Sequence, residues 1–525
     1  MQKIILFLFL FQSFVACSIA QQSEQTKYAD LITEESSRKH LAILASDEFE
    51  GRGTGQKGGE KTVNYIAEQF KSYGLVAPVN GSYFQPVDLI KSLYVAEKFS
   101  IDKQNFVYGQ DFYVQGDNNL SDFSADEIVF VGYGIQDAKY NDLANIDVKG
   151  KIVLLINQGE PMDAQGNYLI SGTKQASEWT TNRFKRIQEL SKLEPKLILA
   201  TGSQVAELIN RAKGRLISPR ISLGKVEADR VAKSPIPVVN ITETVANALL
   251  KNAKTTIEAS QKQLSAEQKP VSKVVKAKFE ARLGVKQEQL HDPNVLGLLE
   301  GSDLKDEIVI VSGHYDHDGI TQDGTIYPGA DDNGSGTVGV MELAKAFAQA
   351  KKDGNGPRRS ILFLAFAAEE KGLLGSQFYS ENPIFPLANT VTCLNLDMIG
   401  RIDDKHLSGN HNYIHVIGAD KLSSELDQAV NQANDTYTKM ELDTMYNDPK
   451  DPMRIYYRSD QYNFAKNGIP VIFFFSGLHP HYHTPEDTVD KIDFPMMVKR
   501  EKLVFYTAWE VANRDKRLAV DSNKK

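Results

Sequence analysis

Five short segments between residues 313 and 484 carry side chains suited to binding metal and moving protons. In chain order they are Gly313-His314-Tyr315-Asp316, Gly329-Ala330-Asp331-Asp332-Asn333-Gly334-Ser335-Gly336, Ala368-Glu369-Glu370, Asn395-Leu396-Asp397 and Tyr482-His483-Thr484. Together they supply two imidazoles and several carboxylates, a ligand set for a pair of zinc ions with one glutamate to spare as a base. Structural zinc sites are cysteine-rich and closed, whereas this chain has only two cysteines. The pattern therefore indicates a catalytic metal site.

The segment His314-Tyr315-Asp316 contains the first imidazole. Alternation along an extended chain puts the side chains of His314 and Asp316 on the same side. His314 can then bind zinc while Asp316 accepts a hydrogen bond from the other ring nitrogen, which fixes the tautomer. His317 is a rival for His314, but it is out of register with the strand. A His-x-Asp alone is weak evidence, because a surface histidine is the usual case.

Two pairs of adjacent acids supply most of the carboxylates. Asp331 and Asp332 lie in a glycine-rich turn, and only one can bridge two metals with one oxygen on each. The other is expected to support the entry into the following helix. Glu369 and Glu370 follow the most hydrophobic run of the chain, where two carboxylates are costly unless cations offset them. Since neighbours at a strand end point in opposite directions, one can bind metal while the other faces a water.

The last two segments add one carboxylate and one imidazole. Asp397 follows another apolar, strand-like run. Of the three histidines His479, His481 and His483, only one is expected to be a ligand. His483 is the best candidate, and Tyr482 stands directly before it.

These segments follow a regular alternation of strands and helices. Strands are expected at 307–311, 360–367, 391–396, 413–417 and 471–475, with a helix after Gly336 and another over 497–513. Near-continuous apolar strands alternating with helices predict an α/β fold: a mainly parallel mixed sheet covered by helices on both faces. Ligands of such sheets gather beyond the carboxyl ends of the strands, so separate strands can deliver these side chains to one place.

A stretch of different texture, 115–268, interrupts this pattern. It contains short β-rich runs such as 127–134, 150–156, 197–200 and 236–241, and none of the expected metal ligands. It is predicted to be an inserted accessory domain. Its end, 253–270, is rich in lysine and glutamine and is expected to be a solvated connector.

Bulk properties limit the function and the location. A net charge of -8, with 41% apolar and 24% charged residues, argues against a nucleic-acid surface. Residues 1–20 have a charged start and a short apolar run, which predicts a signal peptide and an exported, periplasmic or extracellular protein. Cleavage after Ala20 and lipidation at Cys17 are the two alternatives, and the membrane is a partner only in the second. Cys393, in an apolar strand, is expected to be a small buried residue.

The ordered set of five segments resembles the co-catalytic di-zinc aminopeptidase family, which includes vibrio leucyl aminopeptidase and glutamate carboxypeptidase. The resemblance covers nearly all of the chain after its leader. Within the insert, 130–134 and 147–153 are similar to a protease-associated domain. The expected organisation is therefore a leader at 1–20, a peptidase domain in two parts at 21–114 and 269–520, and the insert between them.

The resemblance also implies how the metals are held. His314 and Asp397 would bind one zinc, and Glu370 and His483 the other. Asp332 would bridge them, giving two zinc ions per chain.

The remaining roles come from the same resemblance. Glu369 would be the general base, and Tyr482 would hydrogen-bond the oxyanion of the tetrahedral state. A cis peptide between Asp332 and Asn333 is implied as well. The activity expected is hydrolysis of the N-terminal bond of peptide substrates.

Three alternatives remain open on sequence grounds. One is a carboxypeptidase or dipeptidase of the same family, which would need a cation such as Arg401 or Arg458 for the substrate carboxylate. Another is a glutaminyl cyclase, which has this fold but one zinc; retention of both His314 and Asp397 argues against it. The third is a non-catalytic, receptor-like relative such as the transferrin receptor. The oligomeric state is left open.

Overall fold

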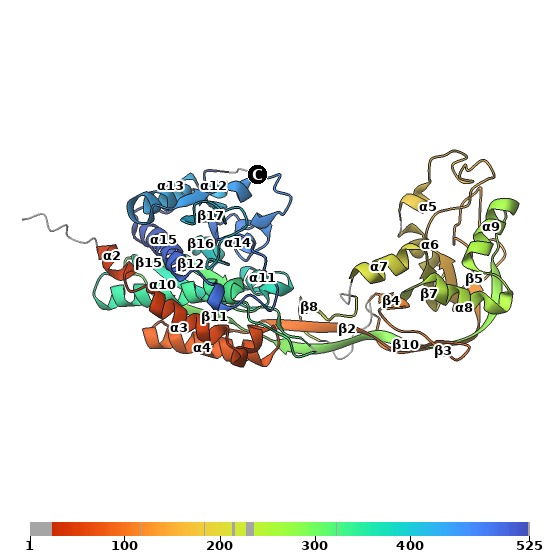
Figure 1. The fold of residues 1–525 in the computed structure, drawn as a ribbon, viewed down its shortest axis with the longest axis horizontal. Coiled ribbons are helices and arrows are strands. Elements are labelled where there is room, and N and C mark those ends of the chain that lie inside the picture. Colours follow the sequence, from red (N-terminus) through yellow and green to blue (C-terminus); the bar gives the residue numbers. More distant parts are fainter. Residues whose placement is uncertain are drawn as a thin grey trace, which may run out of the picture. The chain divides into compact units, whose positions relative to one another are not determined.

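The computed structural model describes residues 24–116, 118–182, 184–212, 216–226, 236–321 and 323–522. The chain divides into two compact units, which are coloured by sequence in Figure 1. The first unit comprises Met1–Leu89 and Leu290–Lys525, and the second comprises Ile90–Gln289. The expected leader, 1–20 with Cys17, lies outside the described residues.

An eight-stranded sheet forms the centre of the first unit, in the order β1-β11-β15-β12-β16-β19-β17-β18. Strand β12 runs parallel to β15 and β16, β16 to β19, and β17 to β18, while the other pairs are antiparallel. The expected mixed α/β sheet is therefore confirmed. The strands are β1 (Phe84–Gln85), β11 (Asn294–Leu299), β12 (Leu304–His314), β15 (Arg359–Phe366), β16 (Thr390–Leu396), β17 (Tyr413–Ile417), β18 (Glu441–Asp443) and β19 (Val471–Phe475).

Helices cover both faces of this sheet, so β15, β16 and β19 are buried along their whole length. On one face, Phe347 of α10 (Gly336–Lys352) packs 6.3 Å from Phe363 and 4.5 Å from Phe505 of α15 (Phe494–Asn513), measured between ring centres. On the other, α11 (Leu374–Glu381) and α14 (Tyr462–Ala465) pack against β15. Each fully buried aromatic ring contributes about 1.5–3 kcal/mol, which fixes the strand ends firmly.

Two helices precede the sheet, α2 (Glu24–Ala29) and α3 (Glu34–Leu44). Thr33 caps the second, since its side chain accepts a hydrogen bond from Ser36 N. The first unit also contains the 3-10 helix Asp47–Arg52, α4 (Lys57–Tyr73), α12 (Ala419–Leu422), α13 (Ser424–Ala433) and the short pair β13 (Gly319–Ile320) and β14 (Ile326–Tyr327). Within the described part of the chain, no helix has the length and apolar character needed to cross a membrane.

The second unit has a sheet of its own, in the order β3-β2-β10-β5-β6-β7-β9-β4, with β8 beside β2. Its strands are β2 (Asp88–Ile101), β3 (Gln104–Asn105), β4 (Phe112–Gln115), β5 (Ser121–Phe130), β6 (Ile152–Ile156), β7 (Leu197–Thr201), β8 (Arg220–Leu223), β9 (Val238–Ile241) and β10 (Lys273–His291). Its helices are α5 (Glu178–Thr181), α6 (Lys185–Ser191), α7 (Gln204–Ala212), α8 (Glu243–Leu250) and α9 (Ile257–Glu267).

The bounds of this unit are wider than the expected insert, 115–268. The long strands β2 and β10 belong mostly to it, and alternate residues of β10 from Val275 to Leu283 are buried. The expected connector is also different, because α9 buries Ile257 and Leu264 in the core of the unit. The prediction of a solvated linker there is wrong.

Candidate metal centre

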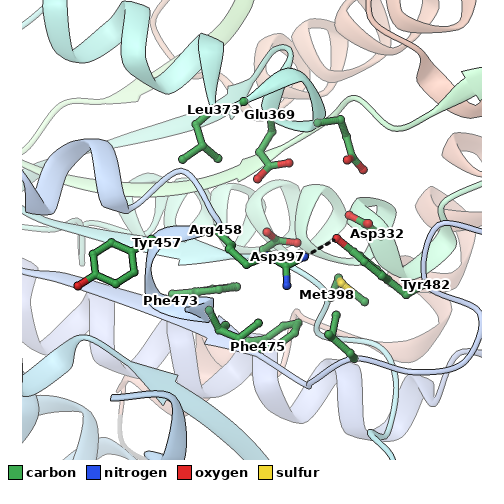
Figure 2. A pocket seen from close by; sticks show the side chains of 14 residues that line it. Asp332, Glu369, Leu373, Asp397, Met398, Tyr457, Arg458, Phe473, Phe475 and Tyr482 are labelled. Carbon is green, nitrogen blue, oxygen red and sulfur yellow. Dashed lines mark hydrogen bonds between the residues drawn. The ribbon is translucent and has the colours of Figure 1, made fainter. Parts of the chain in front are cut away.

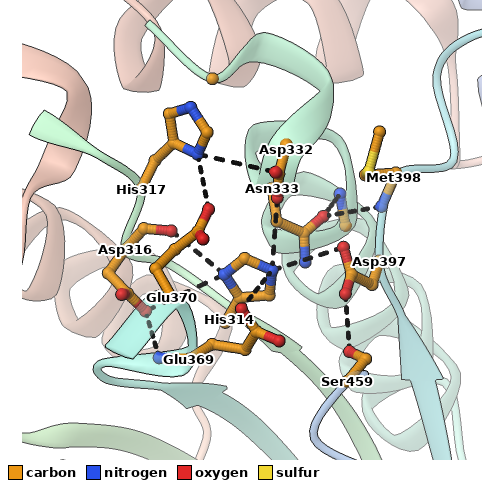
Figure 3. A network of polar contacts seen from close by, with 12 residues as sticks. His314, Asp316, His317, Asp332, Asn333, Glu369, Glu370, Asp397, Met398 and Ser459 are labelled. Atoms are coloured by element: carbon orange, nitrogen blue, oxygen red, sulfur yellow. Dashed lines mark hydrogen bonds and ion pairs between the residues drawn. The ribbon is translucent and has the colours of Figure 1, made fainter. Parts of the chain in front are cut away.

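The carboxyl ends of adjacent strands deliver the first group of site residues. His314 is the last residue of β12, Asp397 follows β16 directly, and Glu369 lies three residues beyond β15. Because β12 lies between β15 and β16, the three side chains meet: His314 Nε2 is 3.3 Å from Asp397 Oδ1 and 3.8 Å from Glu369 Oε2. Figure 3 shows the imidazole among these carboxylates.

Asp332 presents one carboxylate oxygen to each of two ligand groups, His314 with Asp397 and His483 with Glu370. Its Oδ1 lies 3.6 Å from His314 Nε2, and its Oδ2 lies 3.1 Å from His483 Nε2. In the second group, His483 Nε2 is also 3.2 Å from Glu370 Oε2. The structure thus brings together all five expected ligands, in the two groups that the family resemblance implied.

The spacing of these atoms fits zinc. Ligand atoms at ~2.0–2.1 Å from a tetrahedral zinc lie about 3.3 Å from one another. The neighbouring atoms of the two groups are 3.1–3.6 Å apart. A set of nitrogen and carboxylate oxygen donors without thiolate is typical of catalytic rather than structural zinc sites.

A second histidine–carboxylate group in this unit has a different spacing. Asp403 Oδ1 is 2.7 Å from His406 Nδ1, and Asp403 Oδ2 is 2.8 Å from His415 Nε2. These are direct hydrogen bonds, shorter than the separation that a shared zinc requires. The Asp332 groups, in contrast, have the spacing of zinc ligands. In the second unit, no described residue belongs to a group of side chains that could hold a metal.

The imidazole of His314 is held differently from the prediction. Its Nδ1 donates to the backbone carbonyl of Asp316 at 3.1 Å, whereas the nearer carboxylate oxygen of Asp316 is 3.9 Å away. That carboxylate instead accepts hydrogen bonds from Glu369 N at 2.9 Å and Thr54 Oγ1 at 3.0 Å. Asp316 therefore fixes the backbone at Glu369, and its carbonyl leaves His314 Nε2 free for metal.

The glycine-rich turn aims Asp332 at the centre. The peptide bond between Asp332 and Asn333 is cis, as the family resemblance implied. Asp331 points elsewhere, since its carboxylate accepts from Gly400 N at 2.6 Å. The backbone N–H groups of Asp331 and Asp332 both donate to Asp487, each 3.0 Å from its Oδ2. Asp487 was not recognised in the sequence, and nothing near it marks the contact.

Sequence reasoning also missed residues that support the second ligand group. Asp318 Oδ2 lies 3.3 Å from His483 Nδ1, so that a carboxylate orients the ligand ring from behind. His317 was placed out of register with the strand, yet its Nδ1 lies 2.9 Å from Glu370 Oε1. Strand β12 ends at His314, so strand alternation does not apply beyond it. The run of histidine and aspartate at 314–318 was the available signal.

Several residues beside the ligands have left-handed backbone conformations although they are not glycine. Ala368 before Glu369, Met398 after Asp397, and His483 itself have φ between 52° and 54°. Each such residue costs about 1–2 kcal/mol. The surrounding structure holds these residues in this conformation, which turns the neighbouring ligands towards the centre.

Crowded carboxylates dominate the electrostatics of the centre. Burial alone would lower the pKa of His314, but the charge of nearby carboxylates, Glu369 first, holds it well above its usual value. Burial would likewise lower the pKa of His483, yet hydrogen bonds to Asp332 and Glu370 raise it to about 11. Burial, followed by the charge of Glu370, raises the pKa of Asp332 to about 6. Divalent cations would replace the protons that these groups hold.

A pocket of about 400 Å³ opens onto both ligand groups. Figure 2 shows Asp332, Glu369 and Asp397 on one part of its wall and aromatic side chains on another. Tyr482 lines the pocket, and its hydroxyl oxygen accepts a hydrogen bond from Arg458 Nη2 at 3.2 Å. Apolar side chains complete the lining: Leu373, Met398, Ile455, Phe473, Phe475 and Leu478.

Three comparisons relate this chain to known proteins. A model of peptidase family M28 matches residues 294–508, which include all seven expected site residues. A probable leucine aminopeptidase of Arthroderma otae is 32% identical over 267 residues, covering 50% of this chain and 68% of that protein. A probable leucine aminopeptidase of Arthroderma benhamiae is 30% identical over 269 residues, covering 50% and 68%.

A solved structure has the same fold. The aminopeptidase from Aneurinibacillus sp. strain AM-1 matches with a TM-score of 0.51 and 20% identity, covering 95% of this chain and 98% of that one. The chain belongs to peptidase family M28.

Proposed function

We propose that the protein is a zinc-dependent aminopeptidase that binds two zinc ions per chain and removes N-terminal residues from peptides. The observation that carries this proposal is Asp332, whose two oxygens face two separate ligand groups at metal-ligand spacing. A mononuclear site has no use for that arrangement, which also disfavours a one-zinc glutaminyl cyclase. The relatives named as leucine aminopeptidases support the same activity.

Glu369 is the residue placed to move protons. When bound, the zinc ions supply a water with a pKa lowered towards ~7 and polarise the scissile carbonyl. Glu369 lines the pocket but lies outside the two ligand groups, so its carboxylate is free to take a proton and return it to the leaving amine. Burial raises the pKa of Glu369 well above its usual value, which suits a group that must also donate a proton. An intact Glu369 disfavours a non-catalytic relative.

Tyr482 is placed to donate a hydrogen bond to the oxyanion. Arg458 can only donate, so the tyrosine oxygen is the acceptor of their hydrogen bond. The hydroxyl hydrogen of Tyr482 is then free to point into the pocket. A donor held in this way stabilises the negative charge that develops on the carbonyl oxygen.

The charge of the pocket favours a free N-terminus. Four carboxylates line or border it, while Arg458 is the only cation among its described lining residues. An α-ammonium group is accepted by such carboxylates, whereas a substrate carboxylate needs a cation clamp. The apolar wall, which includes Phe473 and Phe475, suits an apolar side chain on the first residue of the substrate.

A carboxypeptidase or dipeptidase is the second candidate, because Arg458 lies in the pocket. Arg401, the other cation considered, is not in the lining. It lies 3.1 Å from His481 Nδ1 and 3.9 Å from Asp487 Oδ1. The carboxylate clamp would therefore be Arg458 alone.

Three versions of one peptide distinguish these activities: free at both ends, acetylated at the N-terminus, and amidated at the C-terminus. Products are followed by mass spectrometry. An aminopeptidase shortens the free and amidated peptides from the N-terminus and spares the acetylated one. Cleavage of the acetylated peptide with stepwise loss from the C-terminus would refute the proposal.

Two further parts of the proposal concern the rest of the chain. We propose that Ile90–Gln289 is a protease-associated-like accessory unit, on the resemblance of 130–134 and 147–153. We also propose export, on the leader pattern of 1–20. The mass of the mature N-terminus tests the second point: Gln21 at the start indicates ordinary cleavage, a lipid on Cys17 indicates anchoring, and a retained Met1 contradicts export.

A further inference from the structure

His317 is buried beside the second ligand group, and the mechanism above gives it no role. None of its surface is exposed. Its Nδ1 lies 2.9 Å from Glu370 Oε1 and 3.8 Å from Asp332 Oδ2. Dashed lines mark both contacts in Figure 3. Its Nε2 is buried and has no hydrogen-bond partner among the described residues.

The contact between His317 and Glu370 is a hydrogen bond, which divides the work of the two carboxylate oxygens. A carboxylate accepts, so His317 Nδ1 carries the hydrogen and donates it to Oε1. The distance of 2.9 Å is shorter than the 3.1–3.2 Å between the ligand atoms of the second group. Oε1 is thereby engaged, while Oε2 faces His483 Nε2 and the metal position.

The ring of His317 is held rigidly enough to direct that hydrogen bond. Gly329 has φ +55°, and a Cβ placed there would lie 2.5 Å from the imidazole, so the ring packs directly on the glycine. The ring of His483 stands edge-on at 5.4 Å between ring centres.

The backbone that carries this ring is fixed as well. Arg52, fully buried, donates to the carbonyls of Tyr315 at 2.9 Å and Gly329 at 2.7 Å. One guanidinium therefore ties together the segment before His317 and the turn against which its ring packs. The nitrogen donor has little freedom to move away from Glu370.

We infer that His317 is a positioning residue: its Nδ1–H group holds Glu370 Oε1, so that Glu370 binds the metal through Oε2 alone. The inference rests on the proposed function, in which Glu370 is a metal ligand. Without the donor, the carboxylate can rotate or offer both oxygens. Partners that orient ligands in this way typically change metal affinity by about 10–100-fold.

The experiment measures metal affinity rather than activity. Apo-protein is titrated with zinc against a chromophoric chelator, so that the two binding events are resolved in each variant. The variants are His317→Leu, which removes the donor, and His317→Asn, which keeps an N–H group near the position of Nδ1. His415→Leu is the matched control, since His415 is equally buried and also contacts a carboxylate, Asp403, outside the metal centre.

The expected result is that His317→Leu weakens one of the two zinc sites by about 10–100-fold and leaves the other unchanged. His317→Asn should stay within a few-fold of the parent protein, and His415→Leu should bind both zinc ions normally. Thermal unfolding of the apo-proteins shows whether each variant is folded before titration.

Two results overturn the inference. One is a His317→Leu protein that binds both zinc ions like the parent. The other is a His317→Asn protein that loses as much affinity as His317→Leu, because the ring itself, as a ligand or as packing, would then matter rather than the donated hydrogen bond. If the parent protein binds fewer than two zinc ions, the proposed function fails instead, so the two failures are distinguishable.

Discussion

Ser459→Ala should lower the free energy of unfolding more than so small a change usually does. Ser459 is the last donor in a buried chain of hydrogen bonds that leads to Asp397. Ser312 Oγ donates to Asn395 Oδ1 at 2.8 Å, and Asn395 Nδ2 donates to Ser459 Oγ at 2.9 Å. Ser459 Oγ then donates to Asp397 Oδ2 at 2.6 Å. Ser312, Asn395 and Ser459 have no exposed surface, so water cannot replace a lost partner.

The expected loss of unfolding free energy follows from the hydrogen bonds that each variant removes. Ser459→Ala removes a hydrogen bond to a charged acceptor and leaves the amide of Asn395 without its acceptor, for a total of about 2–4 kcal/mol of unfolding free energy. Ser312→Ala removes a hydrogen bond between neutral groups and leaves Asn395 Oδ1 without its donor, for about 1–2 kcal/mol; the difference between the two variants is the bond to the charged Asp397. The two changes delete the same atom in equally buried places, so they are a matched pair.

Urea unfolding of the apo-proteins measures both costs. Ser459→Ala should also weaken one zinc site, because Asp397 Oδ1 is left free to turn away from His314 Nε2, 3.3 Å away. Ser312→Ala should bind zinc normally. Equal losses of stability in the two variants, with unchanged zinc affinity in both, would refute the idea that this chain orients Asp397.

Three further predictions follow from the site and its surroundings. Glu369→Gln should keep both metals and lower kcat by roughly 10²-fold or more, whereas Glu370→Gln should lose affinity for one metal; identical behaviour of the two contradicts this division of roles. Tyr482→Phe should lower kcat by about 10²–10³-fold with little change in metal content, and a change in KM alone would assign Tyr482 to substrate binding. Burial alone would lower the pKa of His415, but hydrogen bonds to the carboxylates of Asp403 and Asp443 raise that pKa above its usual value. Its stabilising contribution is therefore complete below pH ~6.5 and is lost as pH rises through the raised pKa, so His415→Gln should cost more stability in urea at pH ~6 than at pH ~9. An equal cost at both pH values would contradict a charged His415.

The central strands of the first unit were predictable because their pattern is simple. β15, β16 and β19 are near-continuous apolar runs bounded by polar residues, which only a sheet covered on both faces explains. The expected burial of Cys393 in β16 is confirmed, and burial raises the pKa of its thiol to about 12.

The second unit was harder to predict. Strand β10 alternates buried apolar residues with lysine, glutamate and arginine, and it begins beyond the expected end of the insert at residue 268. In α9, Ile257 and Leu264 are few among polar residues, but they are the ones that reach the core. Composition outweighed periodicity in that part of the prediction.

Some residues of the site could also be predicted from the sequence, and others could not. His314, Glu369 and Asp397 could be grouped from sequence because parallel strands end at the same edge of a sheet. Ser459 and Asp487 could not, because they reach the centre from 62 and 156 residues away along the chain from their partners. Such contacts depend on how the loops close over the sheet, which no local pattern encodes.

The zinc content of active protein tests the central claim most directly. Elemental analysis of the purified, active enzyme should find two zinc ions per chain, since Asp332 faces two ligand groups. His314→Ala and His483→Ala should each lower that number, and chelation should abolish cleavage until zinc is restored. Full activity with one zinc ion or none would contradict the two-metal account.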